Sequence, residues 1–238
     1  MEFAILYDNT AEGDDFEAGW GFSCLAGSNV LFDTGEEFSF LKSNSIRMNV
    51  DLSGIESVIL SHNHWDHTGG LEGILKKMDN DIKVYGCSDT DSSLRKMIRS
   101  YGGKFVEADG LQEVSNNIYS TGQIEGEYKK NSIMEQSMVV RATEGLAVVT
   151  GCSHPGIVNI IERVRELFPG ERILLVLGGF HLGAAGREEV FSIARKLREL
   201  GVEKTAPAHC TGEEAIDIFR EVYGADFMEA GAGRVLEI

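Results

Sequence analysis

One short segment, "HNHWDH" (residues 62–67), holds three of the six histidines in this 238-residue chain. Residues two apart in an extended segment face the same side, so His62 and His64 can point at one metal ion. If the chain then turns, Asp66 and His67 face a second point close by. Imidazole and carboxylate ligands suit zinc, manganese or iron. The segment therefore predicts a metal centre; the alternative is a loop of surface histidines.

The other three histidines share a position relative to their neighbours in sequence. Each lies at the end of an apolar, strand-like run, in "AVVTGCSHPG", "LLVLGGFHLG" and "TAPAHCTG", and they are His154, His181 and His209. One histidine at a strand end usually has no function, but here all three have this position. We therefore expect all six histidines to serve one site.

The charge balance limits the partners. Lys and Arg number 22 against 38 Asp and Glu, a net charge of −16. Such a surface repels nucleic-acid phosphates and anionic lipids. The short basic runs Lys76-Lys77 and Lys129-Lys130 are expected to be solvated surface. The composition therefore argues against nucleic-acid and membrane partners, and it says nothing of the oligomeric state.

The start of the chain and its cysteines indicate a cytoplasmic location. The opening "MEFAILYDNTAEGDD" has no basic segment followed by a long apolar run, so we expect no signal peptide. No segment approaches the roughly 20 apolar residues of a membrane span. The four cysteines form no CxxC pair and are expected to be reduced, buried hydrophobes: Cys24, Cys87, Cys152 and Cys210.

The hydrophobic pattern predicts a layered α/β sandwich in a single domain, residues 1–238. Residues 145–151 and 172–179 are continuous apolar runs, as in strands covered on both faces. Residues 69–79 and 155–168 have apolar positions at helical spacing. Strand-rich halves flanked by helices favour stacked layers over a simple βαβ arrangement.

The HxHxDH order resembles the signature of the metallo-β-lactamase superfamily. Further matches follow the same order along the chain, including "VLFDTG" and "PAHCTG". The resemblance implies a four-layer αβ/βα sandwich with one or two metals at the strand edge. It also implies that Asp33 supports a metal ligand and that His209 binds a second metal with Asp66 and His67.

Two departures from the superfamily pattern leave the number of metals open. Where "TGD" commonly holds an aspartate that bridges both metals, this chain has "TGCSH", so either His154 or Cys152 can take its place. A thiolate ligand would favour zinc or iron. The middle histidine of the superfamily is also missing. Glu135 and Gln136 lie nearby, and Glu135 is either a replacement ligand or an exposed strand flank. Cys210 is expected to face the core.

A longer set of motifs resembles one branch of the superfamily, the dihydropterin–ribofuranosylaminobenzene phosphate synthases of methanopterin biosynthesis. The set is "LYDNT", "LFDTG", "SHNHWDHTGGL", "VVTGCSHPGIVNII", "GGFHL" and "PAHCTG". This branch is taken to join a dihydropterin diphosphate to an aminobenzene riboside phosphate, and many relatives are predicted hydrolases. The resemblance implies a metal-dependent hydrolase or transferase acting on a phosphorylated or diphosphorylated small molecule.

We predict two divalent ions, zinc first, with manganese or iron as alternatives. The expected metal ligands are His62, His64, Asp66, His67, His154 and His209. Asp66 is also expected to be catalytic, and so is His181, as a hydrogen-bond donor or general acid. Trp20 and Phe180 are either core residues or platforms for a flat ring. The alternatives are a phosphodiesterase, a lactone or thioester hydrolase of the same fold, or a non-catalytic metal-binding module.

Overall fold

The continuous apolar runs form strands in two large sheets. The computed structural model describes residues 1–77 and 81–238. The first sheet has seven strands, in the order β15 (Val235–Glu237), β1 (Glu2–Tyr7), β2 (Ser23–Ala26), β3 (Val30–Phe32), β4 (Ser57–Ile59), β5 (Lys83–Gly86) and β6 (Lys104–Glu107). The second has six, in the order β14 (Val202–Ala208), β13 (Ile173–Gly179), β12 (Leu146–Thr150), β11 (Met138–Arg141), β8 (Ile118–Ser120) and β7 (Gln112–Ser115).

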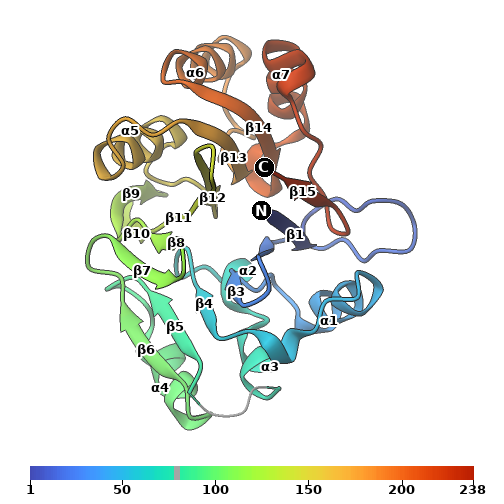
Figure 1. Cartoon of the computed structure of the whole chain (residues 1–238), viewed down its shortest axis with the longest axis vertical. Coiled ribbons are helices and arrows are strands. Elements are labelled where there is room, and N and C mark those ends of the chain that lie inside the picture. The colour runs from blue at the N-terminus through green and yellow to red at the C-terminus, as the bar shows by residue number, and fades with distance from the viewer. Residues whose placement is uncertain (78–80) are drawn as a thin grey trace.

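Helices cover the outer face of each sheet. Figure 1 shows α5 (Ile157–Leu167), α6 (Arg187–Glu199) and α7 (Glu213–Tyr223) on one side, and α1 (Phe38–Arg47), α3 (Leu71–Leu75) and α4 (Ser92–Ser100) on the other. The remaining helical segments are α2 (Trp65–Thr68), η1 (Leu52–Gly54), η2 (His209–Thr211) and η3 (Gly224–Asp226). A buried apolar cluster lies between the two sheets, and one lies under each helix layer. The predicted four-layer αβ/βα sandwich is therefore confirmed.

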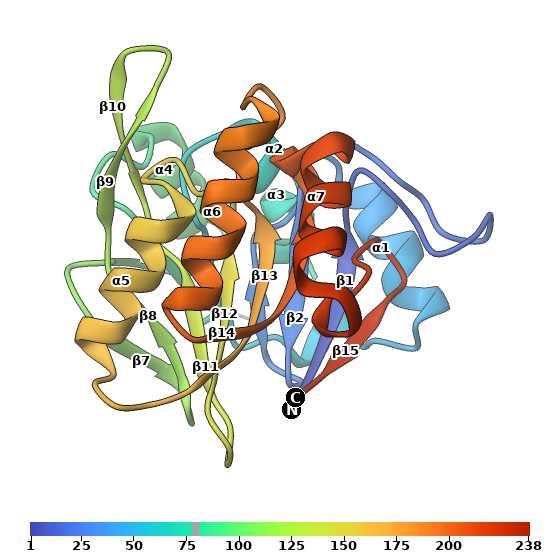
Figure 2. The ribbon, with the colours of Figure 1, turned by 90° about the horizontal axis from the view of Figure 1, so that it is seen from above.

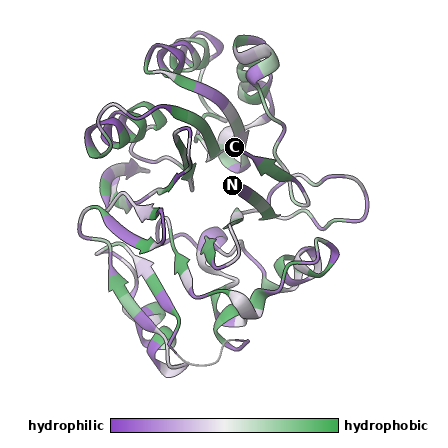
Figure 3. Ribbon diagram, viewed as in Figure 1, coloured by the Kyte–Doolittle hydropathy of each residue, from purple (hydrophilic) through white to green (hydrophobic). Residues whose placement is uncertain are grey.

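The hydropathy of the ribbon follows these layers. In Figure 3 the inner strands are mostly hydrophobic, whereas the outer helices carry hydrophilic residues. Strand β12 is buried along its whole length, and so is β13 apart from Leu174. Burial on both faces explains why these strands read as continuous apolar runs rather than alternating ones.

Parallel pairing brings several strand ends to one edge of the sandwich. β3, β4 and β5 pair in parallel in the first sheet, as do β12, β13 and β14 in the second. The carboxyl ends of parallel strands meet at the same edge. Every histidine of the chain follows one of these ends, so the topology gathers them.

A separate hairpin rises beside this edge. It consists of β9 (Ile124–Tyr128) and β10 (Asn131–Glu135), which form a two-stranded antiparallel sheet. Figure 2 shows it projecting beyond the two main sheets on the side where α2 lies.

The predicted helix over residues 69–79 begins earlier and is divided. α2 starts at Trp65, directly after the extended histidines, and α3 follows it. The predicted helix end lies outside the described residues. Gly69 and Gly70 both have right-handed backbone angles, so a tight turn is not what requires glycine. A Cβ at Gly69 would collide with the carbonyl oxygen of Glu36, and one at Gly70 with that of Thr34. Close backbone approach therefore requires both glycines.

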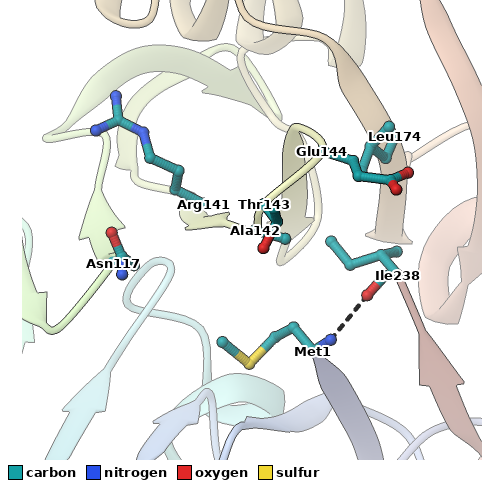
Figure 4. Close-up of a pocket in the computed structure, with 8 residues that line it drawn as sticks. All are labelled: Met1, Asn117, Arg141, Ala142, Thr143, Glu144, Leu174 and Ile238. Carbon is teal, nitrogen blue, oxygen red and sulfur yellow. Dashed lines mark hydrogen bonds between the residues drawn. The ribbon is translucent and has the colours of Figure 1, made fainter.

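The opposite edge of the sandwich holds a cavity of about 710 Å³. Figure 4 shows its lining, where the Met1 amine donates a hydrogen bond to the Ile238 carbonyl. Arg141 at this cavity is already paired with Glu171. The cavity lies at the amino ends of β12 and β13, away from the histidines, so it is not the candidate site.

Two further expectations concern membranes and thiols. Within residues 1–77 and 81–238, every helix falls short of the length and apolar content that a membrane span needs. All four cysteines are free.

Candidate metal centre

The first group of ligands joins the two sheets. Donor atoms of His62, His64 and His154 all lie within 4.8 Å of one another. His62 and His64 follow β4, whereas His154 follows β12 in the other sheet. Both ring nitrogens of His154 are buried without a hydrogen-bond partner. Buried polar atoms are almost always satisfied, so these nitrogens fit a bound cation.

The second group lies beside the first. Donor atoms of Asp66, His67 and His209 also lie within 4.8 Å of one another. Asp66 Oδ2 is 3.7 Å from His67 Nε2 and 3.4 Å from His209 Nε2. His209 Nε2 is buried and makes no hydrogen bond. The donor set of two imidazoles and a carboxylate suits a divalent metal.

The pKa values of these groups follow from burial and from each other. Burial, followed by the charges of neighbouring histidines, lowers the pKa of His154 to about 3. Burial also opposes charge on His67, but Asp33 and Asp66 raise the pKa of His67 to about 9. Burial alone would raise the pKa of Asp66, but His209 and His67 lower it to about 2. A neutral His154 and an ionised Asp66 are the forms that bind metal.

Asp33 fixes the orientation of His67. Its Oδ2 accepts hydrogen bonds from His67 Nδ1 and Ser61 Oγ, both at 2.7 Å, and its Oδ1 accepts from the Ser61 amide at 2.6 Å. A metal that displaced the Nε2 proton would leave the other proton on Nδ1, hydrogen-bonded to Asp33, with Nε2 facing the cluster. The fully buried carboxylate thus holds the ring of His67, which is the contact that its expected supporting role requires.

Asp8 and Asn9 do the same for His209. Asn9 Oδ1 lies 2.9 Å from His209 Nδ1, and the Asn9 side-chain amide donates to the His209 carbonyl at 3.2 Å. Asp8 Oδ1 accepts from the His209 amide at 2.9 Å. Sequence reasoning missed Asp8. Its signal is a carboxylate directly after a buried strand, the same position that Asp33 has after β3.

Cys152 lies where the two groups meet. Its Sγ is 3.3 Å from His67 Nε2, and it lies within 4.8 Å of ligand atoms of His62, His154 and His209. Of the two residues that could take the place of the superfamily's bridging aspartate, His154 belongs to the first group, and Cys152 lies between the two groups. Burial raises the pKa of the Cys152 thiol. A metal deprotonates a thiol that coordinates it.

Cys210 does not face away from the site as expected. Its Sγ belongs to a cluster with Cys152 and His209, with ligand atoms within 4.8 Å of one another. The reason is local: His209 has a left-handed backbone (φ 50°) and begins η2, so strand alternation stops before Cys210.

Glu135 holds the loop that carries Cys152 and His154. Its Oε1 accepts from the amides of Cys152 and Ser153 at 2.8 Å, and its Oε2 accepts from the His154 amide at 2.7 Å. Burial raises the pKa of Glu135 to about 7, even though the three amides act against that rise. Glu135 is 1% exposed, so the predicted exposed flank is wrong. Both oxygens are used by the loop, which explains why a carboxylate stands here.

His181 and Tyr128 border the histidines on the outer side. His181 is exposed, has a left-handed backbone (φ 54°), and places its ring centroid 4.5 Å from that of His154. Tyr128 on β9 lies 4.6 Å from His64 and 5.1 Å from His154, measured between ring centroids. Sequence reasoning missed Tyr128, because nothing in the local pattern shows where the hairpin leans.

A cavity of about 680 Å³ adjoins the second group. It is lined by Asn9, Trp20 and His209 among others. The Trp20 ring lies 5.3 Å from that of His209 and is 51% exposed, so it can stack on a flat ligand. Phe180 is 1% exposed within the core and cannot.

Comparisons with known proteins point to one superfamily. Residues 28–113 match the family described as Beta-lactamase superfamily domain. The 7,8-dihydropterin-6-methyl-4-(beta-D-ribofuranosyl)-aminobenzene-5'-phosphate synthase of Methanocaldococcus jannaschii is 30% identical over 87% of this chain and 84% of its own.

Two solved structures have a fold similar to that of this chain. A metal-dependent hydrolase of the beta-lactamase superfamily is 34% identical, with a TM-score of 0.82, over 100% of this chain and 99% of that one. Human tRNase Z, short form, is 13% identical with a TM-score of 0.66, over 100% of this chain and 99% of that one, and so shares the fold alone.

Proposed function

The chain belongs to the metallo-β-lactamase superfamily, in the branch that resembles the dihydropterin–ribofuranosylaminobenzene phosphate synthases, and on that premise we propose that it is a metal-dependent enzyme acting on a phosphorylated small molecule. The observation that carries the proposal is the pair of ligand groups, His62/His64/His154 and Asp66/His67/His209, meeting at Cys152.

Each group would hold one divalent ion, with Cys152 between them. A thiolate among imidazoles favours zinc or iron, whereas manganese would be an alternative only if Cys152 did not coordinate. Ions bound there would supply Lewis acidity toward a phosphoryl oxygen and would lower the pKa of a bound water.

The residues around the ligands have separate tasks. Asp33 and Asn9 hold His67 and His209 with one ring nitrogen turned toward the cluster. Asp66, a ligand of the second group, would also face the reacting bond. His181, exposed at the rim beside His154, would donate a hydrogen bond or a proton to the leaving oxygen.

The phosphorylated substrate class is supported by the relative from Methanocaldococcus jannaschii, whose name is that of a phosphate-ester synthase. The word synthase in that name, together with the branch resemblance of the sequence motifs, also favours a second candidate, in which a diphosphate leaves and a carbon or nitrogen nucleophile attacks in place of water. The 34% identical protein of known structure is called a metal-dependent hydrolase, which favours attack by water.

Metal content tests the centre. Untagged protein purified without chelators would be assayed by elemental analysis, beside His62→Ala and His209→Ala. We expect about two ions in the parent chain and fewer in either variant. Trp65→Ala is the matched control, because Trp65 is exposed in the same segment but belongs to none of the ligand groups, so it should keep its metal. His181→Ala should lose turnover, because we place His181 on the substrate.

Turnover tests the substrate. The metal-replete protein would be given 4-nitrophenyl phosphate, bis(4-nitrophenyl) phosphate, and a dihydropterin diphosphate with and without an aminobenzene riboside phosphate. Diphosphate release that requires the second compound would assign the synthase, and release without it the hydrolase. Metal-replete protein with no turnover on any of them would overturn the enzyme assignment in favour of a binding module.

A further inference from the structure

The turn of the β9–β10 hairpin is built from residues that suit it poorly. Tyr128 pairs with Asn131, which leaves Lys129 and Lys130 as a two-residue loop. Their φ angles are 49° and 66°. Turns with positive φ at both positions favour Asn-Gly or Asp-Gly. A left-handed backbone costs a residue with a side chain about 1 kcal/mol or more. Residues that are unfavourable for the local backbone conformation are expected mainly at functional sites.

Contacts hold the hairpin against the first ligand group. The Tyr128 ring packs against those of His64 and His154. At Gly126 an added Cβ would meet the backbone carbon of His154 at 2.5 Å, so the strand lies directly on the metal-binding loop. Asp89 accepts a hydrogen bond from the Met134 amide at 2.9 Å on the other strand. These contacts hold both strands of the hairpin next to the first ligand group, and its turn projects beyond them (Figure 2).

The two lysines bring positive charge to this rim. Both are exposed, and Lys129 Nζ lies 4.8 Å from the centroid of the Tyr128 ring. Among the ion pairs formed by the described residues, neither lysine takes part. Glu125 and Glu127 alternate with Tyr128 along β9, so they face away from the histidines. Lys129 thus lies on the ring that packs against His64 and His154, and Lys130 follows it in the same turn.

We propose that Lys129 and Lys130 bind a second phosphate of the substrate, one that lies away from the reacting group, so that the hairpin selects diphosphorylated over monophosphorylated ligands. The inference rests on the proposed function, in which the ligand groups and their ions hold the first phosphate. It replaces the expectation that Lys129-Lys130 is merely solvated surface.

The test compares inorganic phosphate with inorganic diphosphate, titrated calorimetrically into metal-replete protein. The hairpin variant is Lys129→Asn/Lys130→Gly, which removes both charges and supplies the residues that this turn prefers. Lys42→Ala/Lys196→Ala removes the same charge from exposed positions on α1 and α6 and is the matched control. Thermal denaturation should show the hairpin variant as stable as the parent or more so.

We expect diphosphate to bind the parent and the control about tenfold more tightly than phosphate, as charge-assisted contacts allow. In the hairpin variant this preference should disappear while phosphate affinity is kept. Added salt should reduce the preference in the parent.

Three results would overturn the inference in distinguishable ways. A diphosphate preference that survives in the hairpin variant would exclude the lysines and leave the proposed function intact. An equal loss of affinity for phosphate and for diphosphate would mean that the hairpin only holds the metal-binding residues in position. Metal-replete parent protein that binds neither anion would overturn the proposed function together with the inference.

Discussion

At the residue scale, Cys152 is the most informative departure from the superfamily pattern. Its thiol stands where the superfamily pattern places a bridging aspartate, and its Sγ lies near ligand atoms of both groups. Two candidates, Cys152 and His154, were left open by the sequence. Which of the two lies between the ligand groups depends on the turn at Ser153. Its left-handed backbone (φ 63°) separates the two side chains, and no local pattern predicts that angle.

Cobalt substitution tests the role of Cys152. If Cys152 coordinates the ion as proposed, the cobalt-loaded parent should show a thiolate-to-cobalt charge-transfer band in the near ultraviolet. Cys152→Ser should lose the band and bind less cobalt. Cys87→Ser is the control: Cys87 is buried, and its thiol donates to the Ser61 carbonyl outside the ligand groups. A band that persists in Cys152→Ser would contradict the assignment.

Glu135→Gln tests the loop that carries the ligands. The Gln side chain has one oxygen, so its amide nitrogen would face a backbone N–H that Glu135 now satisfies. We expect unfolding free energy to fall by about 1–3 kcal/mol, the cost of an unsatisfied buried donor. Urea denaturation measures it. Glu125→Gln, at an exposed hairpin position, should stay within about 0.5 kcal/mol of the parent; equal effects would argue against the loop contact.

At the element scale, the sequence predicts the site well where strands run in parallel. The apolar runs that end before Asp33 and His62 form neighbouring parallel strands of one sheet, so these two residues meet at one edge. The β9–β10 hairpin could not be placed in this way. Its contacts with His64 and His154 join segments far apart in sequence, and the register of a short, half-exposed hairpin leaves no periodic signal.

The junction between α2 and α3 gives a prediction at this scale. Gly70→Ala would push a methyl group against the Thr34 carbonyl oxygen and displace the turn that carries Asp66 and His67. We expect a loss of about 1–3 kcal/mol in unfolding free energy, as in overpacked cores, together with weaker metal binding. Gly186→Ala is the control, because nothing lies within 4 Å of a Cβ at Gly186. Denaturation and elemental analysis of both variants would decide, and a Gly70→Ala protein equal to the control would refute the packing argument.

At the scale of the whole molecule, the layers were predictable and the strand order was not. Strands buried on both faces and flanking amphipathic helices predict stacked sheets. Which strands pair is decided by non-local contacts, such as that of β1 with β15 at opposite ends of the chain. The position of the site between the two sheets could therefore be expected only from the family resemblance.

Metal should stabilise the molecule as a whole, because the ligands come from both sheets. A ligand present at 100 times its dissociation constant stabilises the native state by about 2.7 kcal/mol. Denaturation of the parent with added zinc, against a chelator-treated sample, should show a shift of that order. A His62→Ala/His209→Ala variant should show none, and an equal shift in that variant would place the bound zinc elsewhere.

The division of ligands between the sheets also has a consequence for biosynthesis. A chain emerges from the ribosome amino end first. His62, His64, Asp66 and His67 are translated well before His209, and until β14 joins its sheet the early donors stand without their partners. An ion captured during translation would meet an incomplete coordination sphere and exchange freely. Tight retention would begin only once β14 has paired with β13, so we expect metal to be bound after translation of the whole chain.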